Sequence, residues 1–171
     1  YAEIREVNKV LLVVVSSDRG LCGAFNSSAF KYTKALIAEE YSAQEAAGGL
    51  TILPIGRKSY EFFSKRGYNV EDKYHNLMAN LNFAEALEAA EYAMEGFIEG
   101  EFDKVEIIYN EFKNVATQIV QNESFLPVEN SEEPEENSSN DVADYIFEPS
   151  RKFIFSEIIP KSLKIQFYKA L

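Results

Sequence analysis

The sequence is poor in the residues that bind metals and form covalent crosslinks. It contains one cysteine, Cys22, and one histidine, His75, in 171 residues. A single cysteine cannot form an internal disulfide, and this usage fits a reducing, cytoplasmic compartment. One cysteine and one histidine also exclude the usual zinc ligand sets, and the acidic residues lack the glycine and ligand spacing of a calcium loop. We therefore expect no metal and no cofactor.

Basic residues are few relative to acidic ones. The chain has 17 Lys and Arg against 28 Asp and Glu, a formal net charge of -11 at pH 7. Such a charge argues against nucleic acid or an anionic membrane surface as a partner. The acidity is local, because the stretch from Glu129 to Asp144 contains acidic residues and no basic one.

Long apolar runs are also missing. No stretch approaches the roughly 20 apolar residues that a membrane-spanning helix needs, so direct membrane insertion is not expected. No charged-then-apolar secretion signal opens the chain. Its first residue is Tyr1, not Met, so we expect a fragment of a longer protein. With 46% hydrophobic and 13% aromatic residues, the chain can bury one sizeable core.

The most informative segment is an unbroken apolar run from Val10 to Val15, followed by a polar loop punctuated by glycine. A run without polar alternation predicts a strand covered on both faces, as in a parallel sheet. Asn26, Ser27 and Ser28 can accept hydrogen bonds at a helix start, and apolar residues recur at helical spacing from Ala29 to Tyr41. Loops of this kind receive ligands or partners. We therefore look for function first between Ser16 and Asn26.

The next segments repeat this pattern. Leu50–Ile55 predicts a second buried strand, kept short by Pro54, and Arg57–Lys65 a short helix. Tyr68–Val70 indicates a brief strand. Asn82 with Glu85 forms a capping-box pattern that predicts a helix over Asn82–Glu99.

Two strand-like runs, Val105–Phe112 and Thr117–Phe125, are separated only by Lys113–Ala116. So short a connection predicts an antiparallel hairpin, because a parallel pair needs a longer crossover. The expected fold class is therefore α/β: a Rossmann-like, mixed but mostly parallel sheet with helices on both faces.

The C-terminal part predicts an insertion and a helix. The acidic, Ser- and Pro-containing segment at about 128–144 lacks the apolar residues to offset its ordering entropy, which predicts a disordered surface insertion. From Arg151 onward the pattern predicts a broad apolar helix interrupted by Pro160, whose wide apolar surface we expect to continue against a partner. We place a globular domain at 1–149 and the beginning of a helical shaft at 150–171.

Several chemical readings of the loop are open from the residues alone. Strand, glycine loop and helix form phosphate and dinucleotide sites, but Gly20 and Gly23 match neither the dinucleotide fingerprint nor the P-loop. Cys22 at a helix start could be a nucleophile with His75 as its base, although nothing places the two together. Asp18 and Arg19 could be a salt-bridged pair or charges offered to another protein.

The loop sequence Ser16-Ser-Asp-Arg-Gly-Leu-Cys-Gly-Ala-Phe-Asn26 resembles the signature loop of the gamma subunits of rotary F-type ATP synthases. A second anchor agrees, since Phe147-Glu-Pro-Ser150, Ile158-Ile-Pro160 and Tyr168-Lys-Ala-Leu171 resemble that family's entry into its long C-terminal helix. Ile107-Ile-Tyr-Asn-Glu-Phe112 and Gln118-Ile-Val are similar to its hairpin strands. The two long helices of the family's coiled coil are absent, except for a beginning after Ser150.

The resemblance implies a non-catalytic rotor subunit of the central stalk, which couples proton flow through the membrane ring to ATP synthesis in the alpha/beta hexamer. Its implied partners are the alpha, beta and epsilon subunits and the c-ring, at the cytoplasmic face of a bacterial plasma membrane. A nucleotide- or phosphate-binding domain is the alternative. The residues expected at a protein interface are Ser17, Asp18, Arg19, Gly20, Leu21, Cys22 and Asn26, facing the underside of the beta subunits.

Overall fold

A computed structural model describes residues 1–114, 117–128 and 154–171. Its sheet has four strands in the order β2-β1-β3-β4. The strands are β1 (Val10–Val15), β2 (Leu50–Ile55), β3 (Lys104–Asn114) and β4 (Thr117–Leu126). β1 pairs in parallel with both β2 and β3, and β3 pairs antiparallel with β4. The expected mixed, mostly parallel sheet is confirmed.

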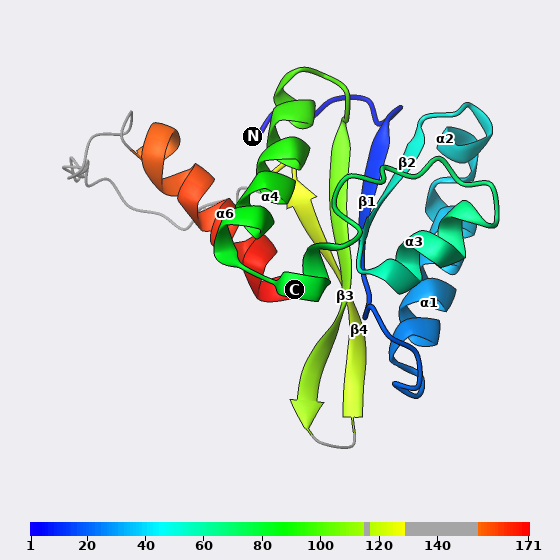
Figure 1. Ribbon diagram of the computed structural model, residues 1–171. Coiled ribbons are helices and arrows are strands. Elements are labelled where there is room, and N and C mark those ends of the chain that lie inside the picture. Colours follow the sequence, from blue (N-terminus) through cyan, green and yellow to red (C-terminus); the bar gives the residue numbers. More distant parts are fainter. Residues whose placement is uncertain (115–116, 129–153) are drawn as a thin grey trace, which may run out of the picture.

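Helices cover both faces of this sheet (Figure 1). On one side lie α1 (Phe25–Glu40), the short α2 (Ser42–Ala46) and α3 (Arg57–Ser64). On the other lie α4 (Phe83–Ile98) and α6 (Ile159–Ala170). The 3-10 turn η1 (Leu77–Asn80) precedes α4, and one π-helical turn, η2 (Ile154–Ile158), precedes α6. The longer predicted strands and helices are thus present in the predicted order, whereas α2 and the two turns were not predicted.

β1 is the central strand, and each of its six residues is at most 3% exposed. Successive strand side chains point to opposite faces. Val10, Leu12 and Val14 therefore join the core under α1 and α3, with Phe30, Ile37 and Phe63 among its buried members. Leu11, Val13 and Val15 join the core under α4 and α6, together with Ala89, Phe97, Leu163 and Phe167. A strand with no solvent face needs an unbroken apolar run, and the sequence supplies one.

A buried polar network links α1 to the sheet beside these cores. The Tyr41 hydroxyl donates to Glu106 Oε1 at 2.8 Å, and Lys104 Nζ lies 2.7 Å from the same oxygen. Asn122 Nδ2 donates to Glu106 Oε2 at 3.1 Å. Burial raises the pKa of Tyr41 to about 12. Burial alone would lower the pKa of Lys104, but its hydrogen bonds to Glu106 and Tyr41 outweigh this and raise it.

The helix α4 begins as its capping pattern predicts. Asn82 Oδ1 accepts from the Glu85 N–H at 2.9 Å, and Asn82 Nδ2 donates to Glu85 Oε1 at 2.8 Å. The segment Tyr68–Val70 is reduced to a single parallel bridge between Ile52 and Val70. The predicted brief strand is therefore present only as this one bridge.

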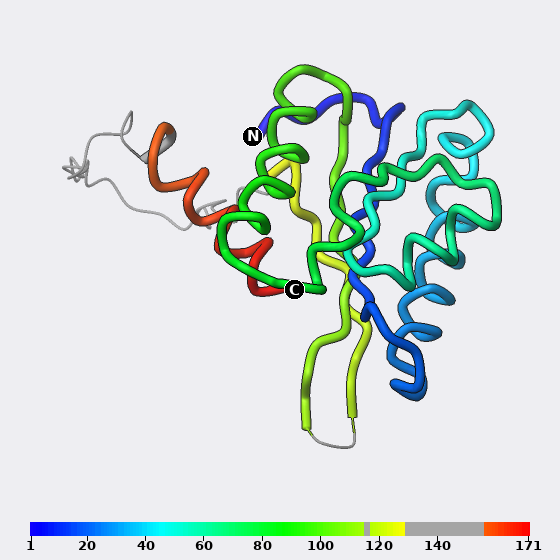
Figure 2. The backbone as a smooth tube through the Cα atoms, viewed as in Figure 1, coloured from blue at the N-terminus to red at the C-terminus, as the bar shows by residue number. Residues whose placement is uncertain are grey.

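The hairpin β3–β4 extends beyond β1, the strand with which β3 pairs. β1 pairs with β3 only as far as Ile108, whereas β3 and β4 remain paired as far as Asn114 and Thr117. The distal half of the hairpin therefore projects past β1, as the tube in Figure 2 shows.

The C-terminal helix changes its form beside Pro160. The π-helical turn η2 ends directly before α6, and the proline lies in the first turn of α6, where its missing N–H is tolerated. Leu163, Phe167 and Ala170 are buried within this chain, while Ile158, Ile165 and Tyr168 are exposed. The expected insertion falls on residues 129–144, outside the described residues apart from Val128. The boundary at 149/150 stays a prediction.

Candidate functional site

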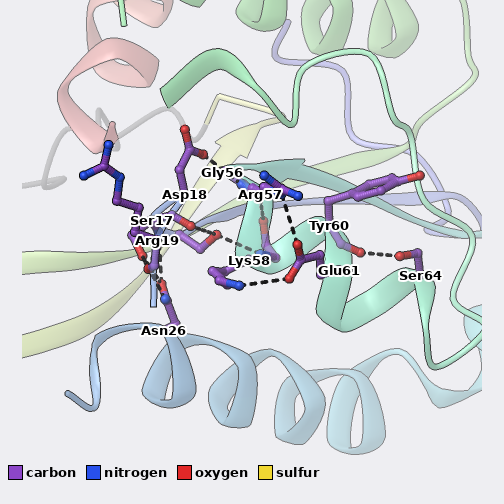
Figure 3. Close-up of polar contacts among 12 residues, drawn as sticks. Ser17, Asp18, Arg19, Asn26, Gly56, Arg57, Lys58, Tyr60, Glu61 and Ser64 are labelled. Carbon is purple, nitrogen blue, oxygen red and sulfur yellow. Dashed lines mark hydrogen bonds and ion pairs between the residues drawn. The ribbon is translucent and has the colours of Figure 1, made fainter. Parts of the chain in front are cut away.

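The loop between β1 and α1 is anchored to the start of α3. The N-cap of α3 is Gly56, which has no side chain to accept bonds from the free amides of the first turn. Residues of the loop do so instead. The N–H groups of Arg57, Lys58 and Ser59 donate to Asp18 Oδ1 at 2.9 Å, to the Ser17 carbonyl at 3.2 Å and to Ser16 Oγ at 2.8 Å (Figure 3).

Asp18 therefore has a role that the sequence did not reveal. Its carboxylate bonds the amide of Arg57, 39 residues away, rather than the side chain of Arg19. A negative charge at a helix N-terminus is favourable, because the free amides and the helix dipole both attract it. Of the two alternatives for Asp18 and Arg19, the salt bridge is not formed among the described residues, and the anion position at the start of α3 is already filled by Asp18.

Gly56 permits the loop after β1 to lie this close to the start of α3. Its φ is 106°, and a Cβ at this position would lie 2.1 Å from the Ser16 carbonyl oxygen. Any other residue would collide with the backbone of the loop. In the sequence, the signal for this contact is a glycine directly before a predicted helix that lacks its own cap.

The other end of the loop is held by Asn26. Its amide oxygen accepts from the Ser17 N–H at 3.0 Å, and its Nδ2 donates to Ser17 Oγ at 2.8 Å. Ser17 Oγ in turn donates to the Arg19 carbonyl at 2.5 Å. The expectation that Asn26 caps α1 is wrong, because the helix begins at Phe25 after Ala24, without a side-chain cap. The polar group of Asn26 is used inside the loop.

The predicted site residues thus divide into two groups. Ser17, Asp18 and Asn26 are half-buried and point inward to hold the loop. Exposed residues form the outer part, namely Arg19, Gly20, Leu21 and Cys22. Figure 3 shows the Arg19 side chain directed away from α3, whereas Asp18 approaches its first turn.

Leu21 is the most unusual residue of the loop. Its φ is 63°, and it is the one non-glycine residue at positive φ in the described chain. Its side chain is fully exposed. The left-handed conformation costs a residue with a Cβ about 1–2 kcal/mol. The fold therefore displays an apolar side chain in solvent and on a strained backbone.

An apolar groove of about 780 Å³ continues from this loop along α1, with Leu21, Phe30 and Phe62 in its lining. Lys31 and Lys34 of α1 also line it, so that positive charge borders the apolar surface. On α3, a hydrogen bond from Lys58 and a second pairing with Arg57 lower the pKa of Glu61.

Cys22 and His75 have different surroundings. Cys22 is exposed, and its Sγ accepts from Asn26 Nδ2 at 3.1 Å. His75 stacks on Tyr60 with ring centroids 4.4 Å apart, and its Nδ1 contacts the Asp72 carbonyl. Neither bonds to the other, so the structure does not assemble a thiol–imidazole pair.

The described side chains include no cluster of three or more His, Cys, Asp or Glu that could hold a metal ion. Within the same part of the chain, every helix is too short or too polar to cross a bilayer.

A family of proteins described as ATP synthase matches residues 1–171. The ATP synthase gamma chain of Cytophaga hutchinsonii is 49% identical over 171 residues, which are 100% of this chain and 58% of that protein. The ATP synthase gamma chain of Chlorobaculum parvum is 43% identical over 166 residues, which are 97% of this chain and 56% of that protein. The chain thus spans little more than half the length of these relatives.

Solved structures show the same fold at lower identity. A chain in the central stalk and c-ring of the Tetrahymena thermophila mitochondrial ATP synthase superposes with a TM-score of 0.62 at 23% identity, covering 97% of this chain and 69% of that one. A chain of the Euglena gracilis mitochondrial ATP synthase rotor gives 0.59 at 17% identity, covering 96% and 60%.

Proposed function

The chain belongs to the family of ATP synthase gamma chains, and on this premise we propose that it is the globular part of a central-stalk rotor subunit. It takes no part in bond making. It couples proton flow through a membrane ring to ATP synthesis by the alpha and beta subunits. Its further partners are the epsilon subunit and the c-ring, at the cytoplasmic face of a bacterial plasma membrane.

The observation that carries this proposal is the division of the loop into anchoring and displayed residues. We expect the contact points of a rotor to be fixed relative to its body, because a loop that deforms changes the position at which force is applied. Ser17, Asp18 and Asn26 tie the loop to α1 and α3, while Arg19 and Leu21 extend into solvent. We assign the displayed residues to contact with the underside of the beta subunits.

A nucleotide- or phosphate-binding domain is the weaker alternative. Anion sites in such folds use the free amides at a helix start. At α3, the amides of Arg57, Lys58 and Ser59 are already bonded to the loop, and the carboxylate of Asp18 would repel a phosphate there. These contacts close the start of α3 to a phosphate. At the start of α1, which follows the loop, Gly20 and Gly23 match neither the dinucleotide fingerprint nor the P-loop, so both positions favour the rotor.

The proposal is tested on the native full-length protein that carries this chain, expressed with an affinity tag in its own cells. We expect alpha, beta and epsilon subunits to copurify with it. Failure of all three to copurify would overturn the rotor assignment.

A charge reversal tests the displayed loop within that complex. In Arg19→Glu, ATP-driven proton pumping by membrane vesicles should fall several-fold while the complex still assembles. Lys65→Glu is the matched control, since it makes the same charge change at an exposed residue of the α3 C-terminus. Equal pumping by both variants would remove Arg19 from the interface.

A further inference from the structure

The two outer edges of the sheet, β2 and β4, differ in how far their backbone groups are paired. The outer edge of β2 is closed, because Ile52 donates to the Asn69 carbonyl and accepts from the Glu71 N–H, both at 2.9 Å. Pro54 in the same strand has no N–H to offer. Natural sheets protect their edges by such devices, since unpaired backbone groups invite another strand.

The outer edge of β4 lacks this protection over its first eight residues. From Thr117 to Ser124, β4 pairs only with β3, and no other described segment bonds its backbone. A register shift between Val105 and Glu106 of β3 ends this regular stretch near Phe125. Beyond it, Val128 donates to the Tyr1 carbonyl at 2.7 Å. The open edge is thus confined to 117–124.

The side chains of the open edge favour strand pairing. The sequence from Thr117 to Asn122 contains no charged residue and no proline, in a chain with 26% charged residues. Threonine, isoleucine and valine at 117, 119 and 120 are residues that strands prefer. Ile119 is 37% exposed, and Phe112 on the neighbouring strand is 70% exposed. Ile119, on β4 itself, would give an added strand an apolar contact beside its backbone partners, whereas Phe112 lies one strand further in.

The edge also adjoins the candidate interface. A cavity of about 350 Å³ is lined by Thr117 and Gln118 at the start of β4, by Cys22 of the loop and by Phe25 at the start of α1. A strand laid along β4 would therefore end beside the loop that we assign to a protein contact.

We propose that the edge of β4 at 117–124 receives an extended strand from a second, different polypeptide, which becomes the fifth strand of the sheet. This inference rests on the proposed function, in that the strand comes from another subunit of the same assembly. Main-chain hydrogen bonds supply the affinity in this mode of recognition, and side-chain contacts supply the specificity.

Charge specifies the incoming strand further. Between residues 109 and 123 of the hairpin, Glu111 and Glu123 outnumber the one described cation, Lys113, and the chain carries a net charge of -11. A second copy of the chain would bring the same negative charge and be repelled. The added strand is therefore neutral or basic, with a β-branched or aromatic residue beside Ile119.

Residue-resolved hydrogen–deuterium exchange on the intact, purified complex tests the proposal, with the same protein released from the complex as reference. In a strand paired on one side, alternate amides are free. We expect alternate amides in 117–124 to exchange at least about 100-fold more slowly in the complex, while those of β2 stay unchanged. Equal rates in both samples would overturn the proposal.

Two other outcomes would also count against it. Slowing of these amides in the released protein with rising concentration would identify a second copy as the occupant. Uniform slowing of all amides in the window, without alternation, would indicate a partner lying over the face of the hairpin. Failure of the complex to purify would instead count against the rotor function, which separates the two proposals.

A variant pair provides a second readout. Ile119→Lys places a charge on the edge, as natural edge strands do, and should abolish the alternating protection without changing Tm by more than a few degrees. Ile98→Lys is the matched control, because Ile98 is an exposed isoleucine on α4. Protection that survives in Ile119→Lys would contradict strand addition.

Discussion

Asn26 and Ser17 are joined by two hydrogen bonds that close the loop after β1. The amide oxygen of Asn26 accepts from the Ser17 N–H at 3.0 Å, and its nitrogen donates to the Ser17 hydroxyl at 2.8 Å. One side chain thus satisfies both the backbone and the side chain of a residue nine positions earlier. The exposed residues between Ser17 and Asn26 are therefore held in place at both ends of the loop.

Asn26→Ala should lower the free energy of unfolding by about 1 kcal/mol, because two half-buried groups of Ser17 lose their partner. Urea denaturation measures the loss. Ser27→Ala is the control, since its exposed hydroxyl donates only to the Ala24 carbonyl at 3.2 Å. A change in Asn26→Ala no larger than in Ser27→Ala would contradict the anchoring role.

Gly56→Ala should destabilise the domain by about 3 kcal/mol or more, because the new methyl group overlaps the Ser16 carbonyl and the residue must keep a positive φ. Gly67→Ala isolates the backbone contribution. Its φ is 79°, and a Cβ there would have no atom within 4 Å. We expect about 1 kcal/mol for the control. Equal thermal stabilities of the two variants would show that the contact at Ser16 is unimportant.

Leu21→Gly should have opposite effects on stability and on assembly. Relief of the left-handed strain outweighs the entropy that glycine adds to the unfolded chain, so stability should rise by about 0.5 kcal/mol. No burial is lost, since the side chain is fully exposed. If the side chain contacts a partner, the complex should dissociate faster. Calorimetry and native mass spectrometry measure the two effects, and unchanged assembly would remove Leu21 from the interface.

Stability should fall as pH rises through the range 10 to 12. The pKa of Tyr41 is raised to about 12 in the folded protein from a usual value of 10.0, so the unfolded chain loses this proton first. Above pH 10 the unfolded state binds fewer protons, and each unit of pH then costs about 1.4 kcal/mol for this group. Tyr41→Phe should reduce this slope by about 1.4 kcal/mol per pH unit in alkaline urea titrations, and part of the remaining slope belongs to Tyr92 and Tyr109, whose pKa burial also raises to about 12. An unchanged slope would show that the Tyr41 hydroxyl is not protected.

ATP or ADP at 1 mM should leave Tm of the isolated chain unchanged. A site with a 10 μM dissociation constant would add about 2.7 kcal/mol under these conditions, a shift that thermal denaturation detects easily. A saturable rise in Tm would revive the nucleotide-binding alternative.

Local and periodic features of the fold were predictable from the sequence. β1 and β2 were placed at their observed bounds because buried parallel strands require unbroken apolar runs. The start of α4 followed from Asn82 and Glu85, which lie three residues apart and act on each other. The short connection after Asn114 was enough to predict that β3 and β4 are antiparallel.

Features that depend on distant residues were not predictable. Asp18 was singled out, but its partner amide at Arg57 belongs to another helix, and no local pattern connects the two. Glu106 lies in a predicted strand, yet its burial depends on contacts with Tyr41, which follows α1, and with Asn122 of β4. The site was found by its position after β1, whereas the division between holding and displayed residues required three-dimensional contacts.

The central strand β1 belongs to two hydrophobic interiors at once, with alternate residues in each. Enlarging Leu12 would press on the α1 and α3 layer, and enlarging Val13 on the α4 and α6 layer, yet both would displace the same backbone. A displacement of β1 caused in one core is therefore passed to the other core through the same six residues. Tolerance to substitution should reach its minimum in this strand, because an error in either interior is passed to the other.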